Sequence, residues 1–204
     1  MAVPPLTPTG PGALPGHPDK PALREMLRAR RAALFEGLGE QSALREAEAT
    51  ADRLLPHIPP QAIVALYFKI QDEIDPQPLI ERLHARGQRL ALPHLTDRTT
   101  MYFRAWAPGD PLQRAVFKLR QPLATAAEVA PDIIVTPLLG FDRQGGRIGQ
   151  GASHYDRAFS RFPGARRLGY AWSVQEVEAV PHDPWDIPLH AIATEREWIV
   201  VPAQ

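Results

Sequence analysis

Residues 62–68 read Ala62-Ile63-Val64-Ala65-Leu66-Tyr67-Phe68, an unbroken apolar run with the length of a typical strand. The run is too short for an independent helix, and its β-branched and aromatic residues favour a strand buried on both faces. A second run of this kind, Asp-Ile-Ile-Val-Thr, occupies residues 132–136. Strands buried on both faces are typical of parallel sheets, because helices cover both sides of such sheets.

The segments around these runs predict the helices that a parallel sheet requires. We expect a helix that begins near Asp19 with Pro21 in its first turn, a second over residues 41–55, and a third over residues 75–86, which Gly87 ends. Further strands are expected over residues 89–93, 101–106, 167–172 and 198–201. This alternation predicts a single α/β domain with a mainly parallel sheet and helices on both faces.

The composition limits the class of protein. A chain of 204 residues suits one domain, and its Pro- and Gly-rich residues 1–18 predict a flexible tail before a domain over residues 19–204. Lys and Arg total 23, as do Asp and Glu, so no overall charge bias favours nucleic acid or a membrane. The absence of cysteine excludes disulfides, thiolate zinc sites and a cysteine nucleophile. With no apolar run near the roughly 18 residues of a membrane span, we expect a cytoplasmic protein.

A glycine-rich segment follows the strand predicted over residues 132–136. Residues 137–157 contain five glycines and lead into a helix expected to begin near Ser153 or His154. Glycines let the backbone approach a ligand closely, and a helix N-terminus offers free N–H groups to an anion. Arg147 adds a positive charge, and Asp156 adds a carboxylate suited to Mg²⁺. The segment fits a polyphosphate site, and it fits equally a glycine-rich surface loop with incidental charges.

Common nucleotide motifs do not account for this segment. The chain has no Gly-x-x-x-x-Gly-Lys-Ser/Thr sequence, so it carries no P-loop. Residues 149–154 lack the last glycine of the dinucleotide-binding pattern, which disfavours a nicotinamide-dependent enzyme.

Four segments in the same order along the chain resemble the signature of the 5-formyltetrahydrofolate cyclo-ligases, also called 5,10-methenyltetrahydrofolate synthetases. They are Lys20-Pro21-Ala22-Leu23-Arg24, Gln71-Asp72-Glu73-Ile74, the run from Gly140-Phe141-Asp142 through Gly145-Gly146-Arg147-Ile148-Gly149-Gln150-Gly151 to Tyr155-Asp156-Arg157, and Asp186-Ile187-Pro188-Leu189 with Thr194-Glu195. The resemblance spans residues 20–196 and implies a NagB/RpiA-like three-layer α/β architecture.

The resemblance also implies an activity. Members of this family close 5-formyltetrahydrofolate into its 5,10-methenyl form with ATP and Mg²⁺, and the γ-phosphoryl group is understood to move to the formyl oxygen before N10 attacks. Such a transfer needs positioning and charge neutralisation more than a protein nucleophile. A small-molecule folate, with or without a polyglutamate tail, is the implied partner, and a monomer or small homo-oligomer is expected.

The family's functional residues map onto this chain one by one. The ATP site would comprise Lys20 and Arg24, which lie four apart on one helical face, and Arg147, Gly149, Gln150, Gly151, Ala152, Ser153, His154 and Tyr155. Catalytic roles would fall on Lys20, Arg147 and Tyr155, and Mg²⁺ would bind Asp156 and Asp186. Folate would meet Phe68 as an aromatic wall, Glu73 as acceptor of two N–H groups, and His154 and Trp106 along the cleft.

Several positions depart from the family pattern. Ser153 replaces a glycine, which costs about 1 kcal/mol if the backbone there needs a positive φ. Ala152 leaves no basic side chain where some members have lysine, and His154 replaces a tyrosine. His190 stands where many members have a second aspartate, so Asp186 alone is expected to serve at that metal position.

Other readings of the sequence remain open. A family paralogue that binds nucleotide or folate as a regulator is one, motivated by the altered loop at residues 152–154. A sugar-phosphate isomerase on a related fold is another, although it would need no ATP. A transition-metal site among His182, Asp183, Asp186 and His190 is disfavoured, because the spacing fits no zinc pattern and two prolines interrupt the segment.

Overall fold

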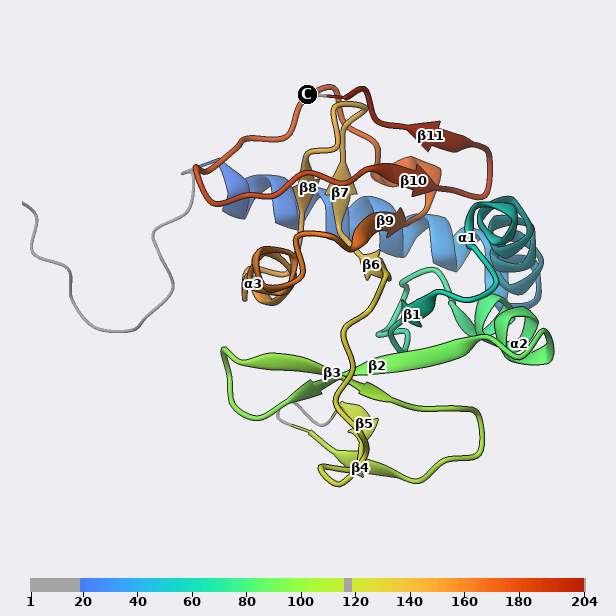
Figure 1. Cartoon of the computed structure of the whole chain (residues 1–204). Helices are drawn as coiled ribbons and strands as arrows, with labels where there is room; N and C mark the ends of the chain where they lie inside the picture. Colours follow the sequence, from blue (N-terminus) through green and yellow to red (C-terminus); the bar gives the residue numbers. More distant parts are fainter. Residues whose placement is uncertain (1–18, 116–118, 204) are drawn as a thin grey trace, which may run out of the picture.

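The computed structural model describes residues 19–115 and 119–203, and its centre is a seven-stranded sheet (Figure 1). The predicted tail over residues 1–18 lies outside the described residues. The strands are β1 (Ile63–Ala65), β2 (Arg89–Leu95), β3 (Met101–Ala105), β6 (Ile133–Pro137), β9 (Arg166–Tyr170), β10 (Ala191–Ala193) and β11 (Trp198–Val200), in the order β11-β10-β9-β6-β1-β2-β3. The five inner strands are mutually parallel, and the edge strands β3 and β11 run antiparallel to their neighbours.

Helices cover both faces of this sheet. The helices are α1 (Lys20–Leu54), α2 (Gln77–Ala85) and α3 (His154–Arg161), with two short 3-10 helices, η1 (Leu55–His57) and η3 (Ser173–Gln175). Successive residues of a strand point to opposite faces. Accordingly Val64 packs in one core cluster with residues of α1 and α2, whereas Ala65 packs in a second cluster with Ala158 and Phe159 of α3. The three-layer α/β architecture predicted from the sequence is confirmed.

The first two predicted helices form one long element with a break. Gly39 has φ 69° and ψ 163°, values outside the helical region, and it separates the two halves of α1. Glycine tolerates a positive φ without the steric cost that a Cβ imposes, which explains why the chain bends there. Pro21 lies in the first turn of α1 and Gly87, with φ 74°, follows the end of α2, as expected.

Several strands were not predicted from the sequence. β10 consists of two alanines and one isoleucine, a composition without strand preference, and it is a strand because β9 and β11 pair with it. Two small hairpins were likewise not predicted, β4 (Leu112–Arg114) with β5 (Arg120–Pro122) and β7 (Gly140–Phe141) with β8 (Arg147–Ile148). The second hairpin matters for the site, because it carries Arg147.

Among the helices described, none combines the length and the apolar character that a membrane crossing requires.

Candidate functional site

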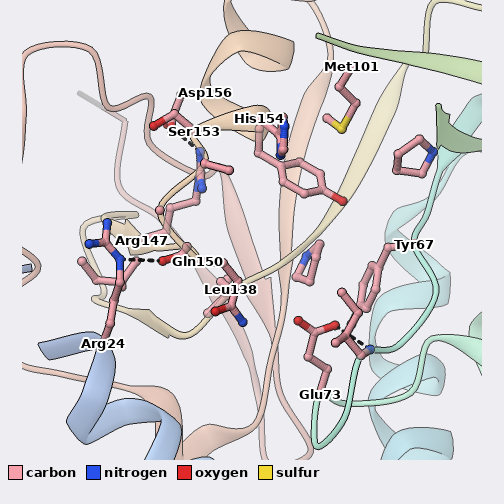
Figure 2. Close-up of a pocket in the computed structure, with 18 of the residues that line it drawn as sticks. Arg24, Tyr67, Glu73, Met101, Leu138, Arg147, Gln150, Ser153, His154 and Asp156 are labelled. Atoms are coloured by element: carbon pink, nitrogen blue, oxygen red, sulfur yellow. Dashed lines mark hydrogen bonds and ion pairs between the residues drawn. The ribbon is translucent and has the colours of Figure 1, made fainter. Parts of the chain in front are cut away.

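A cavity of about 750 Å³ opens where β1, β2 and β6 end, which is the edge of the sheet where a parallel α/β protein is expected to bind ligands. The start of α1 and the glycine-rich segment before α3 close its sides. Every site residue predicted from the sequence lines this cavity except Trp106. Figure 2 shows Arg24 and Arg147 on one side of the cavity and Glu73 and Tyr67 on the other. The cavity therefore has two chemically different ends.

The glycine-rich segment has the backbone conformation that its residues suggest. Gly151 has φ 105°, a value that L-residues with a side chain rarely adopt. Ser153 lies in the left-handed region with φ 50° and ψ 25° and is the N-cap of α3. The position at which serine replaces the family's glycine thus does need a positive φ, so the strain expected from this substitution is present. The first residues of α3 face the cavity.

The cations of α1 meet this segment directly. Arg24 donates through Nε to the carbonyl oxygen of Gly149 at 2.9 Å, and Arg28, one turn further, donates through Nη2 to Oε1 of Gln150 at 3.0 Å. The row at positions 20, 24 and 28 follows from the helical repeat, since residues four apart share a face. These bonds fix α1 against the loop before any ligand binds.

The other two predicted cations are paired with carboxylates. Lys20 Nζ is buried and contacts Oδ2 of both Asp183, at 2.6 Å, and Asp186. Arg147 Nη2 donates to Oδ1 of Asp156 at 2.5 Å, and its guanidinium lies 4.9 Å from the centre of the Phe159 ring. Lys20 and Arg147 therefore each neutralise a carboxylate proposed for Mg²⁺.

The carboxylates at this end suit a magnesium ion. Asp156, Asp183 and Asp186 all line the cavity beside Lys20 and Arg147, and Mg²⁺ is held in proteins by one or two carboxylates together with phosphate oxygens and waters. Asp183 was not assigned this role from the sequence, although it lies only three residues before Asp186. Within residues 19–115 and 119–203 no group of three His, Cys, Asp or Glu side chains is arranged to hold a metal by itself. An Mg²⁺ ion bound here would share its ligands with a substrate.

His190 lies away from this end of the cavity. Its Nδ1 accepts from the backbone N–H of Arg167 at 2.9 Å, and its Nε2 lies 3.0 Å from Nη2 of the same arginine. Burial and the charges of Arg166 and Arg167 lower the pKa of His190. Its side chain thus belongs to the packing around β9.

Glu73 occupies the opposite end of the cavity and is 5% exposed. Its Oε2 accepts from the backbone N–H of Ile70 at 3.1 Å. Burial raises the pKa of Glu73 to about 7, and this effect outweighs the Ile70 hydrogen bond and the nearby Arg31, which both lower it. A buried carboxylate that accepts only one hydrogen bond among the described residues and lines an open cavity is suited to accept N–H groups from a ligand.

An aromatic side chain lies next to this carboxylate. Phe68 lines the cavity, with the Arg120 guanidinium 4.9 Å from its ring centre. Trp106 instead packs edge-on against Phe68 at 5.4 Å between ring centres, is 8% exposed and does not line the cavity. The predicted contact of Trp106 with a ligand therefore has no support in the geometry, because this side chain lies behind Phe68 in the core.

Tyr155 and His154 begin α3 and face different groups. Burial and the negative charge of Glu73 raise the pKa of the partly buried Tyr155 well above its ordinary value, so its phenol stays protonated and can donate a hydrogen bond. His154 lines the cavity and its Nε2 lies 2.8 Å from the carbonyl oxygen of Arg98, to which it donates. Burial lowers the pKa of His154. A neutral imidazole thus ties the glycine-rich segment to the turn between β2 and β3.

Three cationic side chains near the cavity were not predicted. Lys69 and Arg120 line it on the Phe68 side, and Arg31 lies buried beside Glu73. No motif marks them, because their relation to the cavity arises only when α1, β1 and β5 come together.

Comparison with known proteins adds an independent line of information. A sequence model of the 5-formyltetrahydrofolate cyclo-ligase family matches residues 17–195. A 5-formyltetrahydrofolate cyclo-ligase of Escherichia coli K12 is 33% identical over 184 residues, which cover 85% of this chain and 100% of that protein. The NMR structure of 5,10-methenyltetrahydrofolate synthetase from Aquifex aeolicus matches with a TM-score of 0.77 and 28% identity over 91% of this chain and 94% of that one. A 5,10-methenyltetrahydrofolate synthetase from Mycoplasma pneumoniae, at 23% identity, shares the fold with a TM-score of 0.68 over 87% of this chain and 99% of that one.

Proposed function

Because the chain belongs to the 5-formyltetrahydrofolate cyclo-ligase family, we propose that it uses ATP and Mg²⁺ to close 5-formyltetrahydrofolate into 5,10-methenyltetrahydrofolate, with release of ADP and phosphate. Enzymes named for this activity match nearly the whole chain. The reaction forms a carbon–nitrogen bond, which makes the enzyme a ligase.

The observation that carries the proposal is the two-ended cavity. One end gathers Lys20, Arg24 and Arg147 around the carboxylates of Asp156 and Asp186, a set suited to a polyphosphate with its metal ion. The other end offers the aromatic face of Phe68 and the buried carboxyl group of Glu73, a set suited to a flat ring with N–H groups at one edge. A substrate pair of ATP and a pterin would place its reacting atoms between these ends.

The chemistry follows from the poor reactivity of the formyl group. The formyl oxygen attacks the γ-phosphorus of ATP, the bond from phosphorus to the ADP oxygen breaks, and ADP leaves. N10 then attacks the activated carbon and loses its proton, and the bond from carbon to the former formyl oxygen breaks as phosphate leaves. The protein must bring the two substrates together and neutralise phosphate charge, which is what most of a phosphoryl-transfer barrier requires.

At the phosphate end, binding of ATP and Mg²⁺ would replace the ion pairs of the free protein. Lys20 and Arg147 are the cations that would turn from their carboxylates to phosphate oxygens, and Arg24 would hold the loop in place through Gly149. The freed carboxylates of Asp156 and Asp186 would hold Mg²⁺, which supplies positive charge to the phosphates when bound. Nucleotide and metal should therefore each bind more tightly when the other is bound. The nucleotide draws the cations away from the carboxylates that hold the metal, and the metal takes these carboxylates away from the cations.

The protonated Tyr155 lies between the two ends and could donate a hydrogen bond to the transferring phosphoryl group. In this role it would contact the reacting atoms, together with Lys20 and Arg147. Gly149, Gln150, Gly151, Ala152, Ser153 and His154 would form the wall along the nucleotide.

The Phe68 side of the cavity also suggests where the folate tail lies. Lys69 and Arg120 are the cations there, and they are well placed to pair with the carboxylates of one or more glutamyl residues. We therefore expect a preference for polyglutamylated substrate. A cytoplasmic location and a monomer or small homo-oligomer stay predictions from the sequence.

A regulatory paralogue that binds these ligands without reaction would differ only in catalysis. The altered residues Ala152, Ser153 and His154 motivate this alternative, and Ser153 is the one among them with a left-handed backbone. A sugar-phosphate isomerase gains no support, because it has no need of three carboxylates beside a phosphate-binding lysine.

Oxygen tracing tests the proposed reaction directly. With ¹⁸O in the formyl group, the proposal predicts that the phosphate product carries the label and that one phosphate forms per methenyl product. Unlabelled phosphate, or product formation without ATP, would contradict the proposed phosphorylation of the formyl oxygen. A control without protein corrects for slow cyclisation of the folate in solution.

A further inference from the structure

Arg31 of α1 is a buried cation that the proposed reaction does not use. Its side chain is 2% exposed, and Nη2 donates to Oδ1 of Asp72 at 2.7 Å. Its Nη1 lies 3.8 Å from Oε1 of Glu73, outside hydrogen-bond distance, and neither Nη1 nor Nε has a hydrogen-bond partner within the part of the chain described. A guanidinium cannot lose its proton in a protein, so this charge has to be balanced by the neighbouring carboxylates.

The position of Arg31 on α1 links it to the site. Lys20, Arg24, Leu27 and Arg31 are separated by four, three and four residues, so they share one face of the helix. Arg24 meets the glycine-rich segment at Gly149, Lys20 meets the carboxylate of Asp186 at the same end of the cavity, and Arg31 meets the carboxylates at the opposite end. One helix face thus supplies charge to both ends.

The loop that carries Glu73 is held by other contacts. Trp172 donates through Nε1 to the carbonyl oxygen of Asp72 at 3.0 Å, and the Tyr67 hydroxyl donates to that of Ile74 at 2.9 Å. Both of these side chains are buried. The backbone on either side of Glu73 is therefore fixed without Arg31, and the main effect of the arginine is on the charge of the carboxylates.

We propose that Arg31 is a positioning residue for the folate substrate, supplying the positive charge that favours the carboxylate form of Glu73 at the cavity. That the ligand is a folate rests on the function proposed above. The effect of Arg31 on Glu73 does not depend on that function.

The Ile70 N–H also lowers the pKa of Glu73, whereas the remaining groups around Glu73 oppose the charge of Arg31 or do not replace it. Asp72 on the same loop raises the pKa of Glu73, and burial raises it further. Tyr67, which follows β1, and Tyr155 of α3 also face Glu73, and burial keeps the pKa of both phenols high, so both stay neutral. Arg31 is the cation that acts in the opposite direction.

The first experiment is independent of folate. We would follow the side-chain carboxyl carbons of ¹³C-labelled glutamate by NMR as a function of pH, with Glu73→Gln to assign the signal. In Arg31→Met, whose side chain has a similar length and no charge, the titration midpoint of Glu73 should rise by about one pH unit, a tenfold change in its ionisation constant. An unchanged midpoint would overturn the proposal.

The second experiment measures binding of 5-formyltetrahydrofolate by calorimetry from pH 6 to pH 9. Arg31→Met should bind about fivefold more weakly at pH 7, with the deficit shrinking as pH rises, and should bind a non-hydrolysable ATP analogue with Mg²⁺ as the wild type does. Arg31→Lys should recover part of the loss. Equal weakening of both ligands at every pH would indicate a merely structural role and refute the proposal.

Matched variants complete the design. Arg82→Met removes another arginine that ties α2 to α1 through Asp52, away from the cavity, and should leave both measurements unchanged. In a Glu73→Gln background Arg31→Met should cost no further folate affinity, because the group on which it acts is absent. An additional loss in that background would overturn the proposal. If the wild type binds no folate while the NMR midpoint still moves, the proposed function fails and only the effect of Arg31 on the ionisation of Glu73 stands.

Discussion

The ionisation of Glu73 predicts how folate affinity depends on pH. This carboxyl group has a pKa of about 7 in the free protein, mainly because burial disfavours its charge. The ligand would bind the ionised form, which accepts two N–H groups from the pterin edge. Since the pKa is raised above its ordinary value, the binding-competent form is fully populated above neutral pH and is lost as the pH falls through 7.

The size of the effect follows from this pKa. The apparent Kd for 5-formyltetrahydrofolate equals its limiting value multiplied by about 1.1 at pH 8, about 2 at pH 7 and about 11 at pH 6. Affinity should therefore drop about tenfold between pH 8 and pH 6. Binding should also release protons, about 0.5 per folate at pH 7 and about 0.9 at pH 6.

Calorimetry without nucleotide measures both quantities. Titrations at each pH in two buffers with different ionisation enthalpies give the number of protons released, and Glu73→Gln serves as control. The variant should bind more weakly at pH 8 and lose the steep pH dependence, which separates the titration of Glu73 from that of the ligand. A wild-type Kd that stays flat from pH 8 to pH 6, with no proton release, would refute the assignment of Glu73 as the pterin acceptor.

Three further predictions concern the phosphate end, the strained loop and the folate tail. Lys20→Met should weaken binding of Mg²⁺ with an ATP analogue at least about tenfold, yet strengthen binding of Mg²⁺ alone, because Asp183 and Asp186 lose the lysine that pairs with them. Calorimetry measures both affinities, and two unchanged affinities would contradict this prediction. Ser153→Gly should raise the free energy of unfolding by up to about 1 kcal/mol in denaturant titrations and preserve kcat, whereas Ser153→Ala keeps a Cβ and should not raise the free energy of unfolding. A large loss of kcat in the glycine variant would show a role for the hydroxyl. Arg120→Ala should raise the KM of a polyglutamylated substrate by about tenfold more than that of the monoglutamate; equal changes would place the tail elsewhere.

Much of the fold could be predicted because strong local patterns coincide with the elements. The run at residues 132–136 is almost purely β-branched and apolar, and β6 occupies Ile133–Pro137 at the centre of the sheet. The strand Ala191–Ala193 has no such pattern, and only its neighbours in the sheet make it a strand. The break in α1 was predicted approximately, since glycines punctuate helices, but the sequence did not show that one helical element would continue on both sides of Gly39.

The site was predictable to the extent that its residues lie in motifs at strand ends. Arg147, Glu73 and the residues around Ser153 line the cavity as expected. Trp106 does not, because a pattern of apolar residues does not tell which side of a strand end an aromatic ring will face. Arg31 was missed for a different reason: it lies among the arginines Arg28 and Arg30 on a helix, where arginines are usually solvent-exposed, and its burial depends on how α1 packs against the Glu73 loop.

The most direct test of the proposed function is the absorbance of the methenyl-folate band after the protein is mixed with 5-formyltetrahydrofolate, Mg²⁺ and ATP. We predict a rise that requires ATP and Mg²⁺ and that scales with the amount of protein. No rise above the ATP-free control, in a protein that still binds folate and the ATP analogue, would contradict the cyclo-ligase activity and favour a regulatory member of the family.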